Sequence, residues 1–298
     1  MKSEMEDCCL CPRNCHVNRL EGKTGYCGQT ADIRAARAAL HMWEEPCISG
    51  DAGSGAVFFS GCTLGCVYCQ NHQIADGTVG KRISVERLAE IFLELQEQGA
   101  WNINLVTAGH FISPVIGALD MAKKQGLHIP VVYNTSGYEK VDTLKKLEGY
   151  IDIYLPDLKY VDSALAEKYS FAPDYPRVAK AALNEMVRQA GEAQFEGEQM
   201  KKGVIVRHLV LPGQSEASKK VIRYLYETYG DSIFISILNQ YTPMPYLERY
   251  PELNRKITDR EYDEVVDYAI LIGVENGFIQ EGNTAQESFI PEFDITGI

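Results

Sequence analysis

The chain has 298 residues, of which 45% are hydrophobic and 23% charged, and a formal net charge of −12 at pH 7. This is the composition of a soluble globular protein with one main domain. The negative charge argues against nucleic acid as a partner, because such binding depends on Lys and Arg neutralising phosphates. The N-terminus lacks the apolar core of a signal peptide, and no apolar run approaches the roughly 18 residues that span a bilayer. We therefore expect a cytoplasmic protein without membrane contact.

All nine cysteines lie within the first 69 residues. Thiols stay reduced in the cytoplasm, so metal binding is a more natural use for them than disulfide formation. Four have the spacing CxxC-x3-C-x11-C: Cys8, Cys11, Cys15 and Cys27. We expect them to form a Cys-rich N-terminal extension around a metal, either a structural zinc or a second iron–sulfur cluster. Cys9 is an alternative ligand to its neighbour Cys8, and Cys47 is interpreted as a small buried residue.

The first predicted strand, residues 56–61, leads directly into the loop GCTLGCVYCQN, in which Cys62, Cys66 and Cys69 have the spacing CxxxCxxC. The loop therefore starts at the carboxyl end of a strand, where parallel barrels carry their active sites. Three thiolates can hold three irons of a 4Fe-4S cluster and leave the fourth iron open to a ligand from outside the protein. A zinc site completed by His72 or a distant cysteine is the alternative, and it is less favoured because structural zinc loops usually pair two CxxC knuckles.

The rest of the chain alternates predicted strands and helices. After the first strand, β-branched and aromatic runs predict strands at 102–108, 129–137, 151–159, 203–213 and 233–243, with a short seventh strand in 277–282. Helical periodicity appears at 84–99, with Ser84 as N-cap and Gly99 as stop, and at 113–126, 216–230 and 259–274. Residues 189–203 are expected to be an exposed acidic excursion. We predict an α/β fold in which an extension of residues 1–50 precedes a partial (β/α)6 TIM-type barrel of parallel strands, residues 51–298.

With Tyr68 between its last two cysteines, the CxxxCxxC loop resembles that of the radical S-adenosylmethionine (SAM) superfamily. Within that superfamily the sequence is similar over nearly its full length to the glycyl-radical-enzyme activases, and most of all to a branch of pyruvate formate-lyase activating enzyme homologues. Stretches such as CLCPRNCHVNRLEGKTGYCG and EEPCISGDAGSGAVFFSGC carry this similarity. The resemblance implies that the amino and carboxylate groups of SAM chelate the open iron and that Tyr68 packs near adenine.

Five further residues match family positions around SAM or a nearby cation: Asn134 and Thr135 of NTSG, Asp157 and Lys159 of PDLK, and Arg207 of VRHLVLPG. Lys159 and Arg207, on adjacent predicted strand ends, are candidates to pair with the SAM carboxylate through charge-assisted hydrogen bonds. A salt bridge of either residue with Asp157 is the alternative reading.

The sequence departs from the activases at two strand ends. Where activases have a Gly-Gly-Glu that holds the SAM amino group, this chain has TAGHF, and we expect the Thr107 hydroxyl or backbone carbonyls around Gly109 to take that role. His110 is interpreted as a hydrogen-bonded structural residue, with contact to substrate as the alternative. A histidine late in the sixth strand of activases is replaced here by Gln240 or Thr242.

The resemblance implies a reaction in which a one-electron donor, such as flavodoxin or ferredoxin, reduces the cluster. SAM is then cleaved, and the 5′-deoxyadenosyl radical abstracts a hydrogen atom, in activases from a glycine of a glycyl radical enzyme. Two alternatives stay open. One is a radical SAM modification of another peptide, a metabolite or RNA, and the other is a non-enzymatic protein with structural zinc or iron–sulfur centres.

Overall fold

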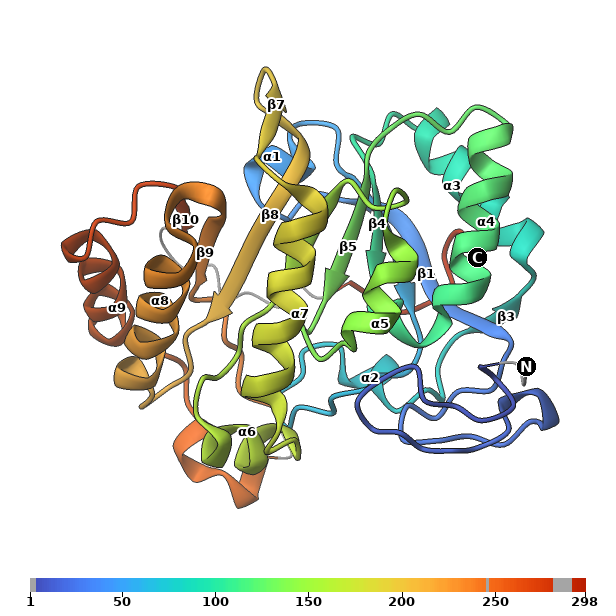
Figure 1. The fold of residues 1–298 in the computed structure, drawn as a ribbon. Helices are drawn as coiled ribbons and strands as arrows, with labels where there is room; N and C mark the ends of the chain where they lie inside the picture. The colour runs from blue at the N-terminus through green and yellow to red at the C-terminus, as the bar shows by residue number, and fades with distance from the viewer. Residues whose placement is uncertain (1–3, 245–246, 281–290) are drawn as a thin grey trace.

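The computed structural model describes residues 4–244, 247–280 and 291–298, which build a ten-stranded open sheet (Figure 1). Its strands are β1 (Ile33–His41), β2 (Ser54–Phe59), β3 (Lys81–Ile83), β4 (Ile103–Val106), β5 (Val131–Thr135), β6 (Ile153–Pro156), β7 (Gln194–Glu196), β8 (Gln199–Leu209), β9 (Phe234–Leu238) and β10 (Gly277–Ile279). They run in the order β10-β9-β8-β6-β5-β4-β2-β1-β3, and β7 pairs with β8. Because β3 and β10 are the two ends of this order, the barrel does not close.

The strand predictions are confirmed for the parallel part of the sheet. Strands β2, β4, β5, β6, β8 and β9 are the six predicted strands, and each pairs in parallel with the next. The predicted seventh strand is β10, which is parallel to β9, although residues 281 and 282 of the predicted range lie outside the described part of the chain. The fold is the predicted partial TIM-type barrel.

The long helices are α3 (Val85–Glu97), α4 (Ile112–Lys124), α7 (Tyr175–Ala190), α8 (Ser215–Tyr229) and α9 (Asp259–Leu271), and the short ones are α1 (Pro46–Ser49), α2 (His72–Ala75), α5 (Val141–Leu144) and α6 (Ser163–Ser170). The Ser84 hydroxyl accepts a hydrogen bond from the Arg87 amide at 3.1 Å and starts α3 as predicted, and Gly99 follows its end with φ +88°. Helix α7, which the sequence analysis missed, lies in front of the sheet in Figure 1. Among the described residues, no helix has both the length and the apolar composition to cross a membrane.

The two faces of the sheet are packed differently. On β2, Val57 and Phe59 belong to the large core formed with the helices, whereas Phe58 faces the other side. At the amino ends of the strands that inner side is filled by α1, whose Cys47 and Ile48 pack against apolar residues of β5, β6 and β8. Cys47 is therefore buried, as the sequence predicted. Helix α1 thus fills the inner side at this end of the sheet.

Three elements extend the sheet beyond the prediction. Strand β1 pairs antiparallel with β2 and with β3, so part of residues 1–50 belongs to the sheet. The division of the chain at residue 50 stays a prediction. Within 189–203, β7 forms a hairpin with β8, and its side chains are exposed as expected, but Met200 is buried. Residues 4–32, the darkest blue segment in Figure 1, lie near α2 at the end to which the parallel strands point.

Candidate active site

A cavity of about 210 Å³ opens at the carboxyl ends of the parallel strands. Its lining brings together ten of the sequence-predicted residues: Cys62, Cys66, Tyr68, Cys69, Thr107, Asn134, Thr135, Asp157, Lys159 and Arg207. These residues come from the ends of β4, β5, β6 and β8 and from the loop after β2. Gly109 is buried and does not line the cavity. The position agrees with the rim at which barrels of this kind carry their sites.

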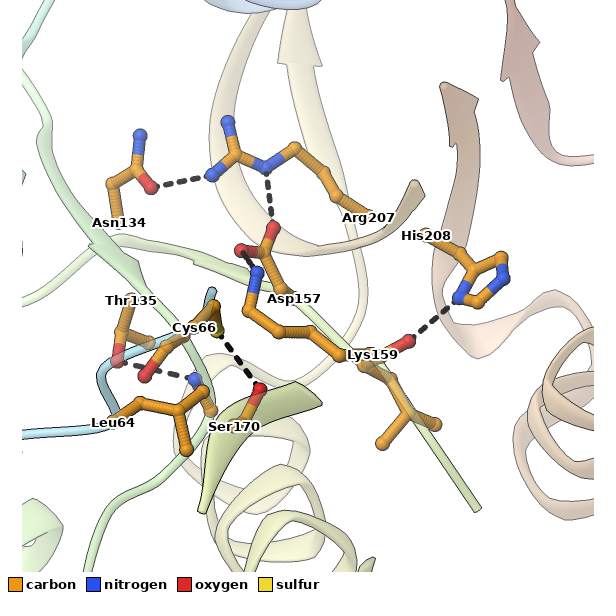
Figure 2. Close-up of polar contacts among 12 residues, drawn as sticks. Leu64, Cys66, Asn134, Thr135, Asp157, Lys159, Ser170, Arg207 and His208 are labelled. Atoms are coloured by element: carbon orange, nitrogen blue, oxygen red, sulfur yellow. Dashed lines mark hydrogen bonds and ion pairs between the residues drawn. The ribbon is translucent and has the colours of Figure 1, made fainter. Parts of the chain in front are cut away.

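Two sulfur atoms of the cysteine loop accept hydrogen bonds, one from the loop itself and one from α6. The Leu64 amide donates to Cys62 Sγ at 3.4 Å, and the Ser170 hydroxyl donates to Cys66 Sγ at 3.0 Å (Figure 2). Burial raises the pKa of Cys66, and it raises that of Cys69 to about 12, so a positive centre is needed to hold these thiols as thiolates. Cys62, Cys66 and Cys69 are the three cysteines in the lining. This donor set fits a 4Fe-4S cluster with one iron left open.

Asp157, a residue of the cavity lining, lies between two cations (Figure 2). Its Oδ2 accepts from Lys159 Nζ at 2.8 Å, and its Oδ1 accepts from Arg207 Nε at 3.1 Å. Burial alone would raise the pKa of Asp157, but the charges of Lys159 and Arg207 bring it below its usual value. The salt bridge that the sequence analysis kept as an alternative is therefore present, and both cations remain at the cavity wall.

Glu44 is a cavity residue that the sequence analysis missed. It lies between β1 and α1, and its Oε2 accepts from Arg207 Nη1 at 2.9 Å. Its Oε1 accepts from Asn104 Nδ2 at 2.9 Å and from Asn134 Nδ2 at 3.2 Å, while Asn134 Oδ1 accepts from Arg207 Nη2 at 2.6 Å. The available signal was a pair of adjacent carboxylates, Glu44 and Glu45, in the otherwise apolar run HMWEEPCI.

Tyr68 joins the cysteine loop to the segment between β6 and α6. Its hydroxyl is 2.6 Å from the Tyr160 hydroxyl, which in turn lies 3.0 Å from Ser170 Oγ. Since Ser170 donates to Cys66, a chain of hydrogen bonds runs from Tyr68 back to a sulfur of the same loop. This chain fixes the loop geometry and leaves Tyr68 in the cavity lining.

Of the TAGHF segment, Thr107 lines the cavity, whereas Gly109 and His110 are buried outside it. Thr107 lines the cavity and adopts φ +62°, a left-handed conformation that is unusual for threonine. A Cβ on Gly109 would lie 2.6 Å from Glu139 Oε1, so only glycine leaves room for this buried carboxylate. Glu139 Oε1 accepts from the Thr135 hydroxyl at 2.7 Å, and burial raises the pKa of Glu139 to about 7. A buried carboxylate that follows β5 therefore lies beside Gly109, but it does not line the cavity.

His110 has the structural role that the sequence favoured. It is buried, its Nε2 faces the Ser60 carbonyl oxygen at 2.7 Å, and it does not line the cavity. Burial lowers the pKa of His110 to about 3, which keeps the ring neutral. Of the two residues proposed to replace the activase histidine, Gln240 lines the cavity and Thr242 does not.

The N-terminal cysteines lie near the cysteine loop, where the Cys27 backbone approaches Gly61. Cys8, Cys11 and Cys27 are buried and Cys15 is partly exposed. Burial raises the pKa of Cys11 to about 12, and the neighbouring charges of Cys27 and Cys15 add to it. Burial also raises the pKa of Cys27, which feels the charges of Cys8 and Cys15. The four thiols are therefore close enough to interact.

Comparisons with known proteins relate the chain to one superfamily. The sequence profile of the Radical SAM superfamily matches residues 56–225. An uncharacterized protein of Methanocaldococcus jannaschii is 26% identical over 275 residues, which cover 90% of this chain and 75% of that protein. The pyruvate formate-lyase-activating enzyme of Clostridium pasteurianum is 27% identical over 120 residues, or 39% of this chain and 49% of the enzyme.

Among solved structures, the FeFe-hydrogenase maturase HydG from Carboxydothermus hydrogenoformans matches with a TM-score of 0.52 and 14% identity, covering 77% of this chain and 54% of that one. This likeness shows a shared fold. The chain thus spans about half the length of HydG and of the C. pasteurianum enzyme.

Proposed function

Because this chain belongs to the radical SAM superfamily, with an activase-like relationship, we propose that it cleaves SAM at the cavity described above and activates a glycyl radical enzyme. The observation that carries the proposal is that Cys62, Cys66 and Cys69 lie in one cavity with partly buried charged side chains and the buried amide of Asn134. With a reduced 4Fe-4S cluster and SAM bound, the site would supply a 5′-deoxyadenosyl radical for hydrogen abstraction.

Lys159 is the residue best placed to hold the SAM carboxylate. Arg207 already donates to Asp157, Glu44 and Asn134, so its guanidinium is occupied in orienting these three side chains. Lys159 Nζ donates to Asp157 at 2.8 Å, and an ammonium group has two further N–H bonds to offer. We assign Lys159 to the SAM carboxylate and Arg207 to positioning. Asn134, Thr135 and Thr107 then present polar groups to the rest of the cofactor.

The partner proposal follows from the relationship to the activating enzyme and from the cavity rim. Trp43 lines the cavity and is 53% exposed, and the adjacent Met42 is 43% exposed. Apolar side chains at the mouth of a polar site suit contact with a polypeptide segment. The remaining partner is a one-electron donor such as flavodoxin or ferredoxin, and the net charge of −12 disfavours nucleic acid.

The first test is SAM cleavage after anaerobic reconstitution with iron and sulfide. Wild type reduced in the presence of SAM should release 5′-deoxyadenosine, and Cys66→Ala should reduce the release at least a hundredfold. Cys9→Ala is the matched control, because Cys9 lies outside the cavity, and it should behave as wild type. No cleavage by fully loaded, reduced wild type, or undiminished activity after prolonged exposure to air, would contradict the proposal.

The substrate is tested by deuterium exchange. If the chain is an activase, deuterium in the 5′-deoxyadenosine should come from a glycine of a candidate glycyl radical enzyme, and that enzyme should acquire a radical signal in electron paramagnetic resonance. Deuterium arriving from another peptide, a metabolite or RNA would reject the activase assignment while keeping the radical SAM chemistry. Zinc at both cysteine groups without SAM binding would support a structural protein instead.

A further inference from the structure

The second group of cysteines forms a site that the proposed chemistry does not use. Cys8, Cys11 and Cys27 are buried, and Cys15 Sγ accepts a hydrogen bond from the Tyr26 amide at 3.3 Å. Arg19, which is 1% exposed, points its Nη1 at Cys8 Sγ, 3.9 Å away. Backbone and guanidinium donors aimed at sulfur stabilise thiolates, and hydrogen bonds to sulfur are a feature of iron–sulfur sites.

Cys8, and not its neighbour Cys9, belongs to this site. Cys9 turns away toward the exposed ring of His16, whose Nδ1 lies 3.4 Å from its Sγ. The backbone of Cys8 is held from both sides, because its amide donates to the Val17 carbonyl at 3.1 Å and its carbonyl accepts from the His16 amide at 3.0 Å. Cys9 is therefore a matched control for the four buried or partly buried ligands.

The four sulfurs are not arranged as a preformed zinc site would be, whereas hydrogen-bond donors reach two of them, as in iron–sulfur sites. Zinc bound by thiolates at about 2.3 Å in a tetrahedron brings the sulfurs to about 3.8 Å from one another. Within the described residues, the one set of three or more potential metal ligands whose atoms all lie within 4.8 Å is Asp7, Cys9 and His16. No three of Cys8, Cys11, Cys15 and Cys27 form such a set, so their sulfurs are not gathered as in a preformed zinc tetrahedron. Cys62, Cys66 and Cys69 do not form one either, and the two groups of cysteines are alike in this respect.

Hydrogen bonds join this site to the loop that carries Cys62, Cys66 and Cys69. Arg13, between Cys11 and Cys15, donates to the Thr63 carbonyl at 2.9 Å and to the Leu64 carbonyl at 2.8 Å. The hydroxyl of Tyr26, the residue before Cys27, donates to the same Leu64 carbonyl at 3.2 Å.

At Gly61, immediately before Cys62, a Cβ would lie 2.4 Å from the Cys27 carbonyl oxygen, so the two backbones touch. Residues next to one metal site therefore contact residues next to the other.

We propose that Cys8, Cys11, Cys15 and Cys27 bind a second 4Fe-4S cluster that passes electrons to the first. One electron from a reduced protein donor of the flavodoxin or ferredoxin class reduces the second cluster. That electron then moves to the cluster on Cys62, Cys66 and Cys69, which reoxidises the second cluster, and no bond is made or broken. The electron-transfer half of this proposal rests on the proposed function, whereas the metal site does not.

The metal site is tested in a chain that lacks the first cluster. The triple variant Cys62→Ala, Cys66→Ala, Cys69→Ala, reconstituted anaerobically with iron and sulfide in the presence of zinc, should retain about four irons and become paramagnetic on reduction. Wild type and Cys9→Ala should each hold about eight irons. A triple variant with no iron, or with zinc in its place, overturns the site, and so does a loss of iron in Cys9→Ala. This readout stands whether or not SAM is cleaved.

Electron transfer is tested by following the reduction of the first cluster with freeze-quench electron paramagnetic resonance. In Cys15→Ser, reduction by ferredoxin or flavodoxin should slow at least tenfold more than reduction by dithionite, because the small reductant does not depend on one entry route. Equal slowing with both reductants would mean that the second cluster has a structural role and does not pass electrons. If Cys15→Ser does not fold, Cys27→Ser provides the same comparison, and the iron count of the triple variant is unaffected.

Discussion

Arg207 connects three cavity residues that lie far apart in the sequence. Its guanidinium lies between Glu44 and Asp157, whose side chains are 8% and 22% exposed. Arg207→Met would leave two partly buried carboxylates without this partner, and we expect it to lower the free energy of unfolding by up to about 3–5 kcal/mol. Urea denaturation measures this change. Arg260→Met, at an ion pair whose arginine is 88% exposed, should change the free energy of unfolding by less than about 1 kcal/mol. Equal losses in the two variants would show that the network around Arg207 stabilises the fold no more than an exposed ion pair does.

Glu139 makes stability depend on pH. Burial raises its pKa to about 7, from 4.5 in an exposed glutamate, and the hydrogen bonds from Thr135 and Tyr133 only partly oppose this. Between these values the folded chain keeps a proton that the unfolded chain has released, so this contribution to stability is lost as the pH rises.

The Glu139→Gln variant removes that titration. Relative to it, wild type should lose up to about 3 kcal/mol of unfolding free energy between pH 4.5 and pH 7, by thermal or urea denaturation. Glu167→Gln, an exposed site, should follow wild type. A constant difference between wild type and Glu139→Gln across this range would mean that folding does not raise the pKa of Glu139.

At the scale of elements, the cysteine loop depends on the N-terminal extension for its fixed position. Besides the Thr63 and Leu64 carbonyls, Arg13 reaches the Phe171 carbonyl at 2.7 Å, so one side chain joins the extension, the loop and the end of α6. Arg13→Gln should therefore raise amide hydrogen exchange in residues 61–69 about tenfold or more, since each lost hydrogen bond costs on the order of 1 kcal/mol.

Arg37→Gln is the control for Arg13→Gln, because Arg37 pairs with Asp294 at the surface. It should leave exchange in residues 61–69 unchanged. If Arg13→Gln also left it unchanged, the loop would be rigid without the extension, and the two metal sites would be mechanically independent.

The elements differ in how well the sequence predicts them. Helix α3 was clear because Ser84 and Gly99 mark its ends and large apolar residues line one face. Helix α7 was missed although its buried face, which includes Val178, Leu183 and Met186, contrasts with its polar face as clearly as that of α3 does. Strand β1, IRAARAALH, is rich in residues that favour helices. It is extended because it pairs with β2, and local propensity does not predict such a tertiary contact.

The same limit applies to the site at the scale of the whole molecule. Motif position predicted the residues at strand ends, such as Asp157, Lys159 and Arg207, because parallel strands bring their carboxyl ends to one rim. Glu44 was missed because it enters the cavity from a segment before the first parallel strand, where a pair of adjacent carboxylates was the one signal. Its partner Arg207 is 163 residues away, and no periodicity encodes such a contact.

The C-terminal segment also reaches the cavity wall from a distance. Its backbone pairs with β1, where Ile295 donates to the Ala36 carbonyl at 3.1 Å and Ala38 donates to the Thr296 carbonyl at 2.9 Å. Phe293 then stands edge-on to Phe58, with ring centroids 5.5 Å apart. Since Phe58 lines the cavity, the end of the described chain supports a wall of the site.

Phe293→Ala tests this support. We expect a loss of about 1–2 kcal/mol in unfolding free energy, less than the 3–5 kcal/mol typical of fully buried phenylalanine, because Phe293 is partly exposed. The vacated space lets Phe58 move, so SAM affinity, measured by anaerobic calorimetry, should fall about threefold or more. Phe195→Ala is matched, since its ring also lies 5.5 Å from a phenylalanine, Phe234, but outside the cavity. A similar loss of affinity in both variants would trace the effect to general destabilisation, whereas a loss confined to Phe293→Ala would show that the C-terminal segment shapes the SAM site.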